Sequence, residues 1–230
     1  VRRPSWHTHA VDWYLETLHR LNVPVHWNFQ WLPPRPTVAE SVKRKWQTDA
    51  ARWIILQPGA RWLNKRWPVE AWAELVARLA AAHPGRRFAI LGGGDERDLG
   101  AAIARADSDR CLDLTGNLSL TEMVEWIRSG ELIVTNDTGP MHVAAALQKP
   151  LVALFGPTEP RRTGPYGRLD SVLQLKLPCV PCMKPYCNYA EPLACLRGMA
   201  VGPVFDRVEQ ELKKNHLGLA PGAGRSKMVP

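Results

Sequence analysis

The chain has 230 residues, a formal net charge of +8 and 45% hydrophobic residues. This length can bury a sizeable core, and the balance of apolar and charged residues is that of a globular protein, which excludes a disordered or membrane-spanning class. No apolar run reaches the roughly 18 residues that a transmembrane helix needs. The positive charge favours an anionic partner, and a phosphorylated glycolipid, a bilayer surface, a nucleic acid and a nucleotide all remain open.

The first 48 residues are rich in Trp and Pro and have no sheet pattern. Apolar residues at helical spacing in THAVDWYLETLHRL predict a one-sided helix. The prolines of VPVHWNFQWLPPRP predict an extended spacer. Thr37 and Glu40 have the spacing of a capping box, which predicts the start of a short basic helix. We interpret residues 1–48 as the end of one domain followed by a linker.

From Arg52 onward, short apolar runs alternate with amphipathic helical segments. This alternation is typical of a parallel sheet covered by helices on both faces. We therefore predict an α/β, Rossmann-like domain over residues 49–217, including a Cys-rich loop at 176–198, and a disordered tail at 218–230. The predicted strands are WIIL (53–56), FAIL (88–91), CLDL (111–114), LIVT (132–135), LVALF (151–155) and SVLQL (171–175). Ser119 and Glu122 form a second predicted capping box.

The run LIVT is followed by the triplet Asp137-Thr138-Gly139, which admits two readings. An aspartic protease requires two such carboxylates that share a proton in an all-β setting. This chain has one triplet, and alanines at helical spacing follow it, so the protease reading is discarded. A helix beginning near Pro140 would instead direct the N–H groups of Thr138, Gly139 and Met141 at an anion over the strand end.

Other side chains are expected at the same edge of the sheet, because ligands gather at the carboxyl ends of parallel strands. Lys65 can pair with a phosphate, whereas its neighbour Arg66 is expected to be a solvated loop cation. Glu96 or Asp95 can accept ribose hydroxyls. His142, one turn into the helix, can donate a hydrogen bond; the simpler interpretations are a helix N-cap for Asp137 and a surface polar residue for His142.

Four cysteines fall in one segment, as Cys179-x2-Cys182-x4-Cys187-x7-Cys195. In a reducing compartment, clustered cysteines favour a metal over disulfides, and these four predict a structural Zn²⁺ site. Reduced structural thiols and disulfides are the alternatives.

The sequence resembles the C-terminal half of glycosyltransferase family 9, the ADP-heptose:lipopolysaccharide heptosyltransferases. The matching stretches are QPGARWLNKRWPVEAWAELVARL, AILGGGDE, LTGNLSLTEMVEWIRSGELIVTNDTGPMHVAAALQKPLVALFGPTEPRRTGPYG and PCVPCMKPYCNYAEPLACL. They span roughly residues 52–212 in the family's order and spacing. The resemblance implies the donor-binding half of a GT-B fold and inverting heptose transfer to the lipopolysaccharide inner core, at the cytoplasmic face of the inner membrane, with no cofactor required for catalysis.

Carried over by position, the resemblance implies that Lys65 contacts the diphosphate and Glu96 the adenosine ribose. Asp137, Thr138, Gly139 and His142 would contact the diphosphate and heptose. The expected partners are ADP-heptose or a similar nucleotide sugar and an anionic glycolipid acceptor, with no nucleic acid.

The base that deprotonates the acceptor is expected in an N-terminal domain, of which only HAVDWYLETLHRLNV resembles the end. A partner chain, or a non-catalytic role in a larger assembly, is the alternative.

Overall fold

A computed structural model describes residues 1–25 and 31–217. The predicted tail, 218–230, and residues 26–30 of the predicted spacer lie outside the described residues. At the centre is a six-stranded parallel sheet with the strand order β3-β2-β1-β4-β5-β6. The strands are β1 (Arg52–Gln57), β2 (Arg86–Ile90), β3 (Cys111–Asp113), β4 (Leu132–Asn136), β5 (Leu151–Phe155) and β6 (Val172–Gln174). All six predicted strands are therefore confirmed, and the α/β class with them.

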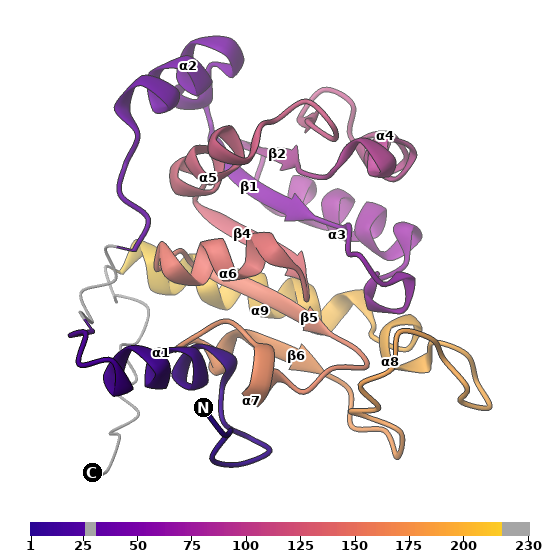
Figure 1. Ribbon diagram of the computed structural model, residues 1–230. Coiled ribbons are helices and arrows are strands. Elements are labelled where there is room, and N and C mark those ends of the chain that lie inside the picture. The colour runs from indigo at the N-terminus through magenta and orange to yellow at the C-terminus, as the bar shows by residue number, and fades with distance from the viewer. Residues whose placement is uncertain (26–30, 218–230) are drawn as a thin grey trace.

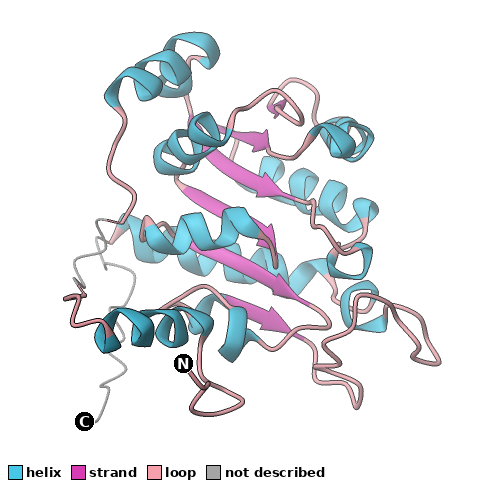
Figure 2. Cartoon of the chain, viewed as in Figure 1, coloured by secondary structure: helices cyan, strands magenta, loops and turns pink. Residues whose placement is uncertain are grey.

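Helices cover both faces of the sheet (Figures 1 and 2). On one face a core forms beneath α3 (Val69–Ala82), α4 (Arg97–Ala104) and α9 (Val201–His216). On the other face a second core forms beneath α2 (Pro36–Trp46), α5 (Leu120–Ser129) and α6 (Gly139–Ala146). The central strands are buried on both sides, which explains why β1, β4 and β5 read as continuous apolar runs rather than as alternating ones.

Short helices complete the loops at the sheet edges. They are η1 (Thr48–Ala50), η2 (Leu63–Lys65), η3 (Gly94–Glu96), α7 (Pro160–Thr163), η4 (Leu169–Ser171) and α8 (Ala194–Arg197). Helix α1 (Ala10–Arg20) lies beside α7 at the β6 end of the sheet (Figure 1). No residue within the bounds of α1 is buried.

Of the two predicted capping boxes, one is confirmed. Ser119 accepts the Glu122 N–H, and the Glu122 carboxylate accepts the Ser119 N–H, at the start of α5. The box at Thr37 and Glu40 is wrong, because α2 begins at Pro36 and its N-cap, Arg35, makes no side-chain cap bond. The backbone N–H of Arg35 instead donates to the Glu125 carboxylate of α5, so a tertiary contact sets this helix start.

Four of the tryptophans are buried in the two cores. Trp53 and Trp126 pack edge to face with ring centroids 5.3 Å apart, and Trp67 and Trp72 with centroids 5.4 Å apart. All four side chains are buried, whereas Trp6 is more than half exposed. The high Trp content of the sequence therefore reflects core packing first.

Candidate functional site

The predicted site residues lie where the strand order of the sheet reverses. Strand β1 is flanked by β2 and β4, and crevices beyond the carboxyl ends of strands at such a switch point are the usual ligand sites of open α/β sheets. Lys65 follows β1, Asp137 follows β4 and Glu96 follows β2. Three segments that are far apart in the sequence thus meet at one edge of the sheet.

An ion pair joins the two sides of the switch point. The Nζ of Lys65 lies 2.7 Å from the Asp137 Oδ2, and the hydroxyl of Thr158 donates to the same oxygen at 2.6 Å. The Asp137 residue is 6% exposed, while the Lys65 side chain keeps 18% of its area exposed. The carboxylate is therefore held by two donors, and the Lys65 side chain keeps some contact with solvent.

Asn136 ties the loop after β1 to the loop after β4. Its buried amide donates to the Pro58 carbonyl at 2.6 Å, and its carbonyl accepts the Trp67 N–H at 3.3 Å. These two bonds bracket the segment that carries Lys65. They fix Lys65 relative to Asp137 without using either side chain.

The start of α6 has the form expected of an anion site, with one correction. Thr138 is the N-cap and makes no side-chain cap bond, so Asp137 is not the cap that the simpler interpretation required. A side chain at Gly139 would meet only open space, which leaves the backbone accessible to a ligand. The Met141 N–H, however, donates to the Thr138 carbonyl at 3.2 Å, so the prediction that it faces an anion is wrong.

Glu96 and Arg66 form a second pair, which joins the loop after β2 to the loop after β1. The Arg66 Nη2 lies 3.1 Å from the Glu96 Oε1, and the Gly93 N–H donates to Oε2 at 3.0 Å. Arg66 is half-buried, and its Nε also donates to the Ala60 carbonyl at 2.8 Å. The expectation that Arg66 is a solvated loop cation is therefore wrong.

His142 lies one turn into α6, as predicted, with its side chain reaching solvent. Desolvation by the surrounding protein lowers its pKa, and the Asp137 carboxylate opposes the shift. The charges of His9 and Lys65 add to the lowering. His142 is therefore biased toward the neutral imidazole, which can donate one hydrogen bond and accept another.

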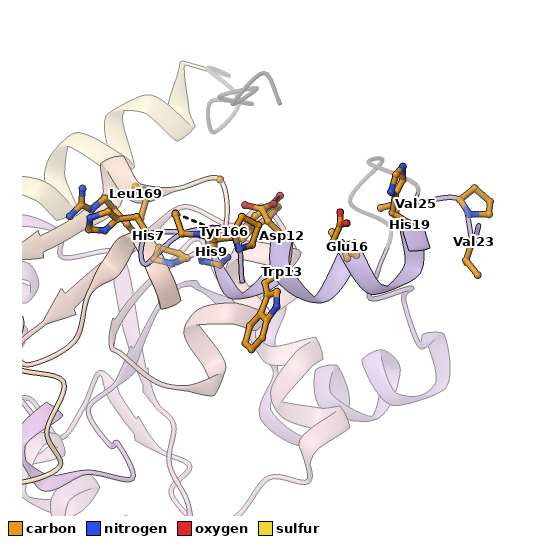
Figure 3. Close-up of a pocket in the computed structure, with 18 of the residues that line it drawn as sticks. His7, His9, Asp12, Trp13, Glu16, His19, Val23, Val25, Tyr166 and Leu169 are labelled. Carbon is orange, nitrogen blue, oxygen red and sulfur yellow. Dashed lines mark hydrogen bonds between the residues drawn. The ribbon is translucent and has the colours of Figure 1, made fainter. Parts of the chain in front are cut away.

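A separate cavity of about 1240 Å³ opens between α1 and the segment from Arg161 to Asp170. His9 caps α1, accepting the Val11 N–H with Nδ1, and its Nε2 lies 3.0 Å from the Gly164 carbonyl oxygen. The Tyr166 hydroxyl donates to the Asp12 carboxylate (Figure 3). The lining of the cavity mixes histidines, carboxylates and aromatic rings along α1.

The four predicted metal-ligating cysteines do not form a metal centre in this arrangement. All are free, and across residues 1–25 and 31–217 no group of three or more His, Cys, Asp or Glu side chains is placed to hold a metal ion. The Sγ of Cys187 accepts the Leu193 N–H at 3.2 Å, and Cys195 is buried in a core cluster. The thiols of Cys179, Cys182, Cys187 and Cys195 line a small pocket of about 170 Å³ instead.

Two hydrogen bonds to backbone carbonyls join the loop that carries these cysteines to the loops after β1 and β5. Asn64, next to Lys65, donates through its side-chain amide to the Lys184 carbonyl at 2.8 Å. The Met183 N–H donates to the Pro157 carbonyl at 2.8 Å, one residue before Thr158. The loop at 176–198 is therefore hydrogen-bonded to the segments that follow β1 and β5.

The family model that describes glycosyltransferase family 9 (heptosyltransferase) matches residues 1–192. The chain is 34% identical over 139 residues to lipopolysaccharide heptosyltransferase 1 of Pseudomonas aeruginosa, a match that covers 60% of this chain and 38% of that protein. It is 38% identical over 123 residues to lipopolysaccharide heptosyltransferase 2 of Escherichia coli, covering 51% of this chain and 35% of that protein. The aligned part thus spans well under half the length of these curated relatives.

Solved structures agree on the fold. The ADP-heptose lipopolysaccharide heptosyltransferase II of E. coli matches with a TM-score of 0.69 and 26% identity, over 85% of this chain and 57% of that chain. The E. coli heptosyltransferase WaaC with ADP matches with a TM-score of 0.63 at 22% identity, over 91% of this chain and 59% of that chain. The six-stranded sheet therefore has the architecture of one part of these larger GT-B enzymes.

The structure brings together most, but not all, of the residues that the sequence singled out. Lys65 and Asp137 contact each other, Thr138 and Gly139 form the start of α6, and Glu96 lies in the loop after β2. Sequence reasoning missed Thr158 and Asn136. Both are buried polar residues: Asn136 ends β4, and Thr158 lies three residues after the end of β5. A polar residue at or just beyond the end of an apolar run is the signal that could have pointed to them.

Proposed function

This chain belongs to glycosyltransferase family 9, the heptosyltransferases, and we propose that its switch-point site binds the donor ADP-heptose for inverting transfer of heptose to the lipopolysaccharide inner core. The ion pair of Lys65 with Asp137 beside the start of α6 carries the proposal. It places a cation, a helix N-terminus and a carboxylate together where one nucleotide diphosphate sugar can meet all three.

The leaving group determines what Lys65 must do. When the bond from the sugar to the diphosphate breaks, negative charge develops on the diphosphate. In the proposed complex, Lys65 and the free N–H groups at Thr138 and Gly139 stabilise that charge, so the transfer requires no cofactor. Lys65 then contacts both Asp137 and the diphosphate, and the ion pair with Asp137 fixes the position of its Nζ.

Asp137 has an orienting role in this proposal. Its carboxylate already accepts bonds from Lys65 and Thr158, and its remaining acceptor positions are available to sugar hydroxyls. Because Lys65 and Thr158 both contact Oδ2, we assign Asp137 to orientation of the sugar rather than to deprotonation of the acceptor. His142 adds a donor to the diphosphate or the sugar.

The acceptor half of the reaction requires a base for the acceptor hydroxyl. We propose that this base is an Asp of the N-terminal half of the GT-B fold, carried by the same protein or by a partner chain. An anionic glycolipid acceptor would approach across the cavity beside α1, where Arg161 and the histidines lie. No helix within the described residues is long and apolar enough to cross a membrane. We propose that the protein reaches such an acceptor by peripheral attachment at the cytoplasmic face of the inner membrane.

A second candidate is a non-catalytic homologue that serves a larger assembly. It is favoured by the exposed apolar side chains of Trp6, Tyr14 and Leu21 in and around α1. A subunit of this kind would keep the fold without a need to bind the donor. Measurement of donor binding separates the two candidates.

Isothermal titration calorimetry with ADP and with ADP-heptose tests the proposal. We expect Lys65→Met to weaken both ligands about 10–100-fold, because a charge-assisted contact contributes roughly 1.5–3 kcal/mol. Asp137→Asn should weaken ADP-heptose more than ADP, because its proposed contact is to the sugar. The matched control is Lys213→Met, at an exposed position on α9. Absence of ADP binding at millimolar concentration would refute the donor site.

A further inference from the structure

The carboxylate of Glu96 is held by two donors, one on each oxygen. Arg66 Nη2 lies 3.1 Å from Oε1, and the Gly93 N–H donates to Oε2 at 3.0 Å. The residue is only 8% exposed, so its orientation is set by the protein rather than by water. A buried carboxylate fixed in this way can present a defined set of lone pairs to a ligand.

Arg66 is itself fixed at both ends of its guanidinium group. Nε donates to the Ala60 carbonyl at 2.8 Å while Nη2 reaches Glu96, so the group bridges the loop after β1 and the loop after β2. The adjacent cation, Lys65, pairs with Asp137 instead. The two neighbouring cations therefore form ion pairs with two different carboxylates. Because Arg66 is paired with Glu96, we do not assign it to phosphate binding.

The Glu96 carboxylate lies directly on bare backbone. A Cβ atom at Gly59 would come within 1.9 Å of Oε1, and one at Gly92 within 2.9 Å of Oε2. Neither glycine has a positive φ, so the need at Gly59 and Gly92 is for space rather than for backbone freedom. The two strand-end loops thus leave a slot that the carboxylate fills.

The free acceptor positions of this carboxylate define its ligand. A carboxylate has about four acceptor positions, two on each oxygen. Arg66 and Gly93 use one on each, which leaves one on Oε1 and one on Oε2. Two oxygens that each accept one further bond match two hydroxyl groups on adjacent carbons, as in the 2′ and 3′ positions of a ribose.

We propose that Arg66 is a positioning residue: it holds the Glu96 carboxylate so that the site recognises a vicinal diol and selects ribonucleotides over 2′-deoxyribonucleotides. This inference rests on the proposed function, since it assumes that a nucleoside diphosphate occupies the site. It assigns the selection to the pair of Arg66 and Glu96 rather than to either side chain alone.

Calorimetry with ADP and 2′-deoxy-ADP tests the inference. The wild-type protein should bind ADP about 10–100-fold more tightly, because a hydrogen bond to a charged group is lost with the 2′-hydroxyl. Arg66→Met should bring this ratio down to a few-fold, mainly by weakening ADP, and Arg66→Lys should restore part of it. The control is Arg78→Met, which removes an arginine paired with Glu74 on the surface of α3.

A second variant reaches the same carboxylate without removing a charge. Gly59→Ala should push Glu96 out of its slot and lower the ratio as Arg66→Met does, even if the Arg66 variant folds poorly. Gly94→Ala is the matched control, because a Cβ there meets nothing within 4 Å. Thermal unfolding of each variant shows whether the fold is retained.

The outcomes separate this inference from the proposed function. If wild-type protein binds both nucleotides equally, or if Arg66→Met weakens both by the same factor, the positioning role is overturned while the donor site stands. If wild-type protein binds no ADP, the proposed function fails and the inference fails with it. A lowered ratio in both Arg66→Met and Gly59→Ala, with the two control variants unchanged, supports the positioning role.

Discussion

The buried carboxylate of Asp137 is stabilised by two individual side chains. Lys65 supplies a charge and Thr158 a hydroxyl, both to Oδ2. Burial of an ionised group is costly unless such partners remain, so each partner contributes to stability as well as to ligand geometry. The triplet in the sequence predicts that Asp137 matters, but it says nothing of Thr158, which lies 21 positions later.

Replacement of Thr158 tests this dependence. We expect Thr158→Val to lower the free energy of unfolding by about 1–3 kcal/mol, because the shape is kept while a buried acceptor loses its donor. Urea unfolding followed by circular dichroism measures the change. Thr158→Ser, which keeps the hydroxyl, should stay closer to wild type. Equal stability of the Val variant and the wild type would contradict this account.

At the scale of elements, the strands follow from local sequence and the helix starts only in part. Apolar runs predict β1, β2, β4 and β5 because central parallel strands are buried on both faces. The edge strands β3 and β6 are only partly buried, and the runs CLDL and SVLQL predict them as well. Ser119 caps α5 through bonds within four residues, so the sequence is sufficient there. The start of α2 depends on Glu125 of α5, and no pattern near Thr37 can contain that contact.

Helix α1 is held to the rest of the fold by a histidine whose protonation matters. His9 accepts the Val11 N–H with Nδ1, which requires that nitrogen to be unprotonated. Burial lowers the pKa of His9, while the Gly164 carbonyl and Asp12 oppose this and Arg3 adds to it. A depressed pKa means that the folded state prefers the neutral ring. The contribution of His9 to stability is therefore present above its unfolded pKa, near 6.5, and is lost as the pH falls through the lower folded pKa.

Hydrogen exchange of the first turn of α1 checks this pH dependence. Protection of amides 11–14, corrected for intrinsic exchange rates, should fall as the pH decreases below about 6.5. His9→Asn keeps a capping acceptor but does not titrate in this range, so its protection should vary less with pH. The variant also separates His9 from His142, whose pKa is lowered too. The same pH profile in both proteins would contradict the assignment to His9.

At the scale of the whole molecule, the order of the strands in the sheet brings the site residues together. The loops after β1, β2 and β4 converge only because β1 lies between the other two strands. A ligand that bridges these loops would bind the folded chain and not the unfolded one, since its proposed contacts extend from Lys65 to His142. Donor binding should therefore stabilise the entire domain.

A thermal shift measures that coupling. At an ADP concentration of 100 times its Kd, the unfolding free energy should rise by about 2.7 kcal/mol, which corresponds to an increase in Tm of roughly 5–10 °C for a domain of this size. Adenosine lacks the diphosphate and should give a much smaller shift at the same concentration. Equal shifts with ADP and adenosine would argue against contact of Lys65 with the diphosphate.

The sequence by itself determined the α/β class, the six strands and the likeness to the heptosyltransferases, and it predicted an anion site at the loop that holds Asp137. These depend on hydrophobic periodicity and on the chemistry of adjacent residues, which are local properties of a chain. Only the tertiary structure decided that Lys65 pairs with Asp137, that Arg66 contacts Glu96 instead of facing solvent, and that the four cysteines line one small pocket. Each of these depends on distances between segments tens of residues apart, and those distances are set by strand order and by packing on the two faces of the sheet.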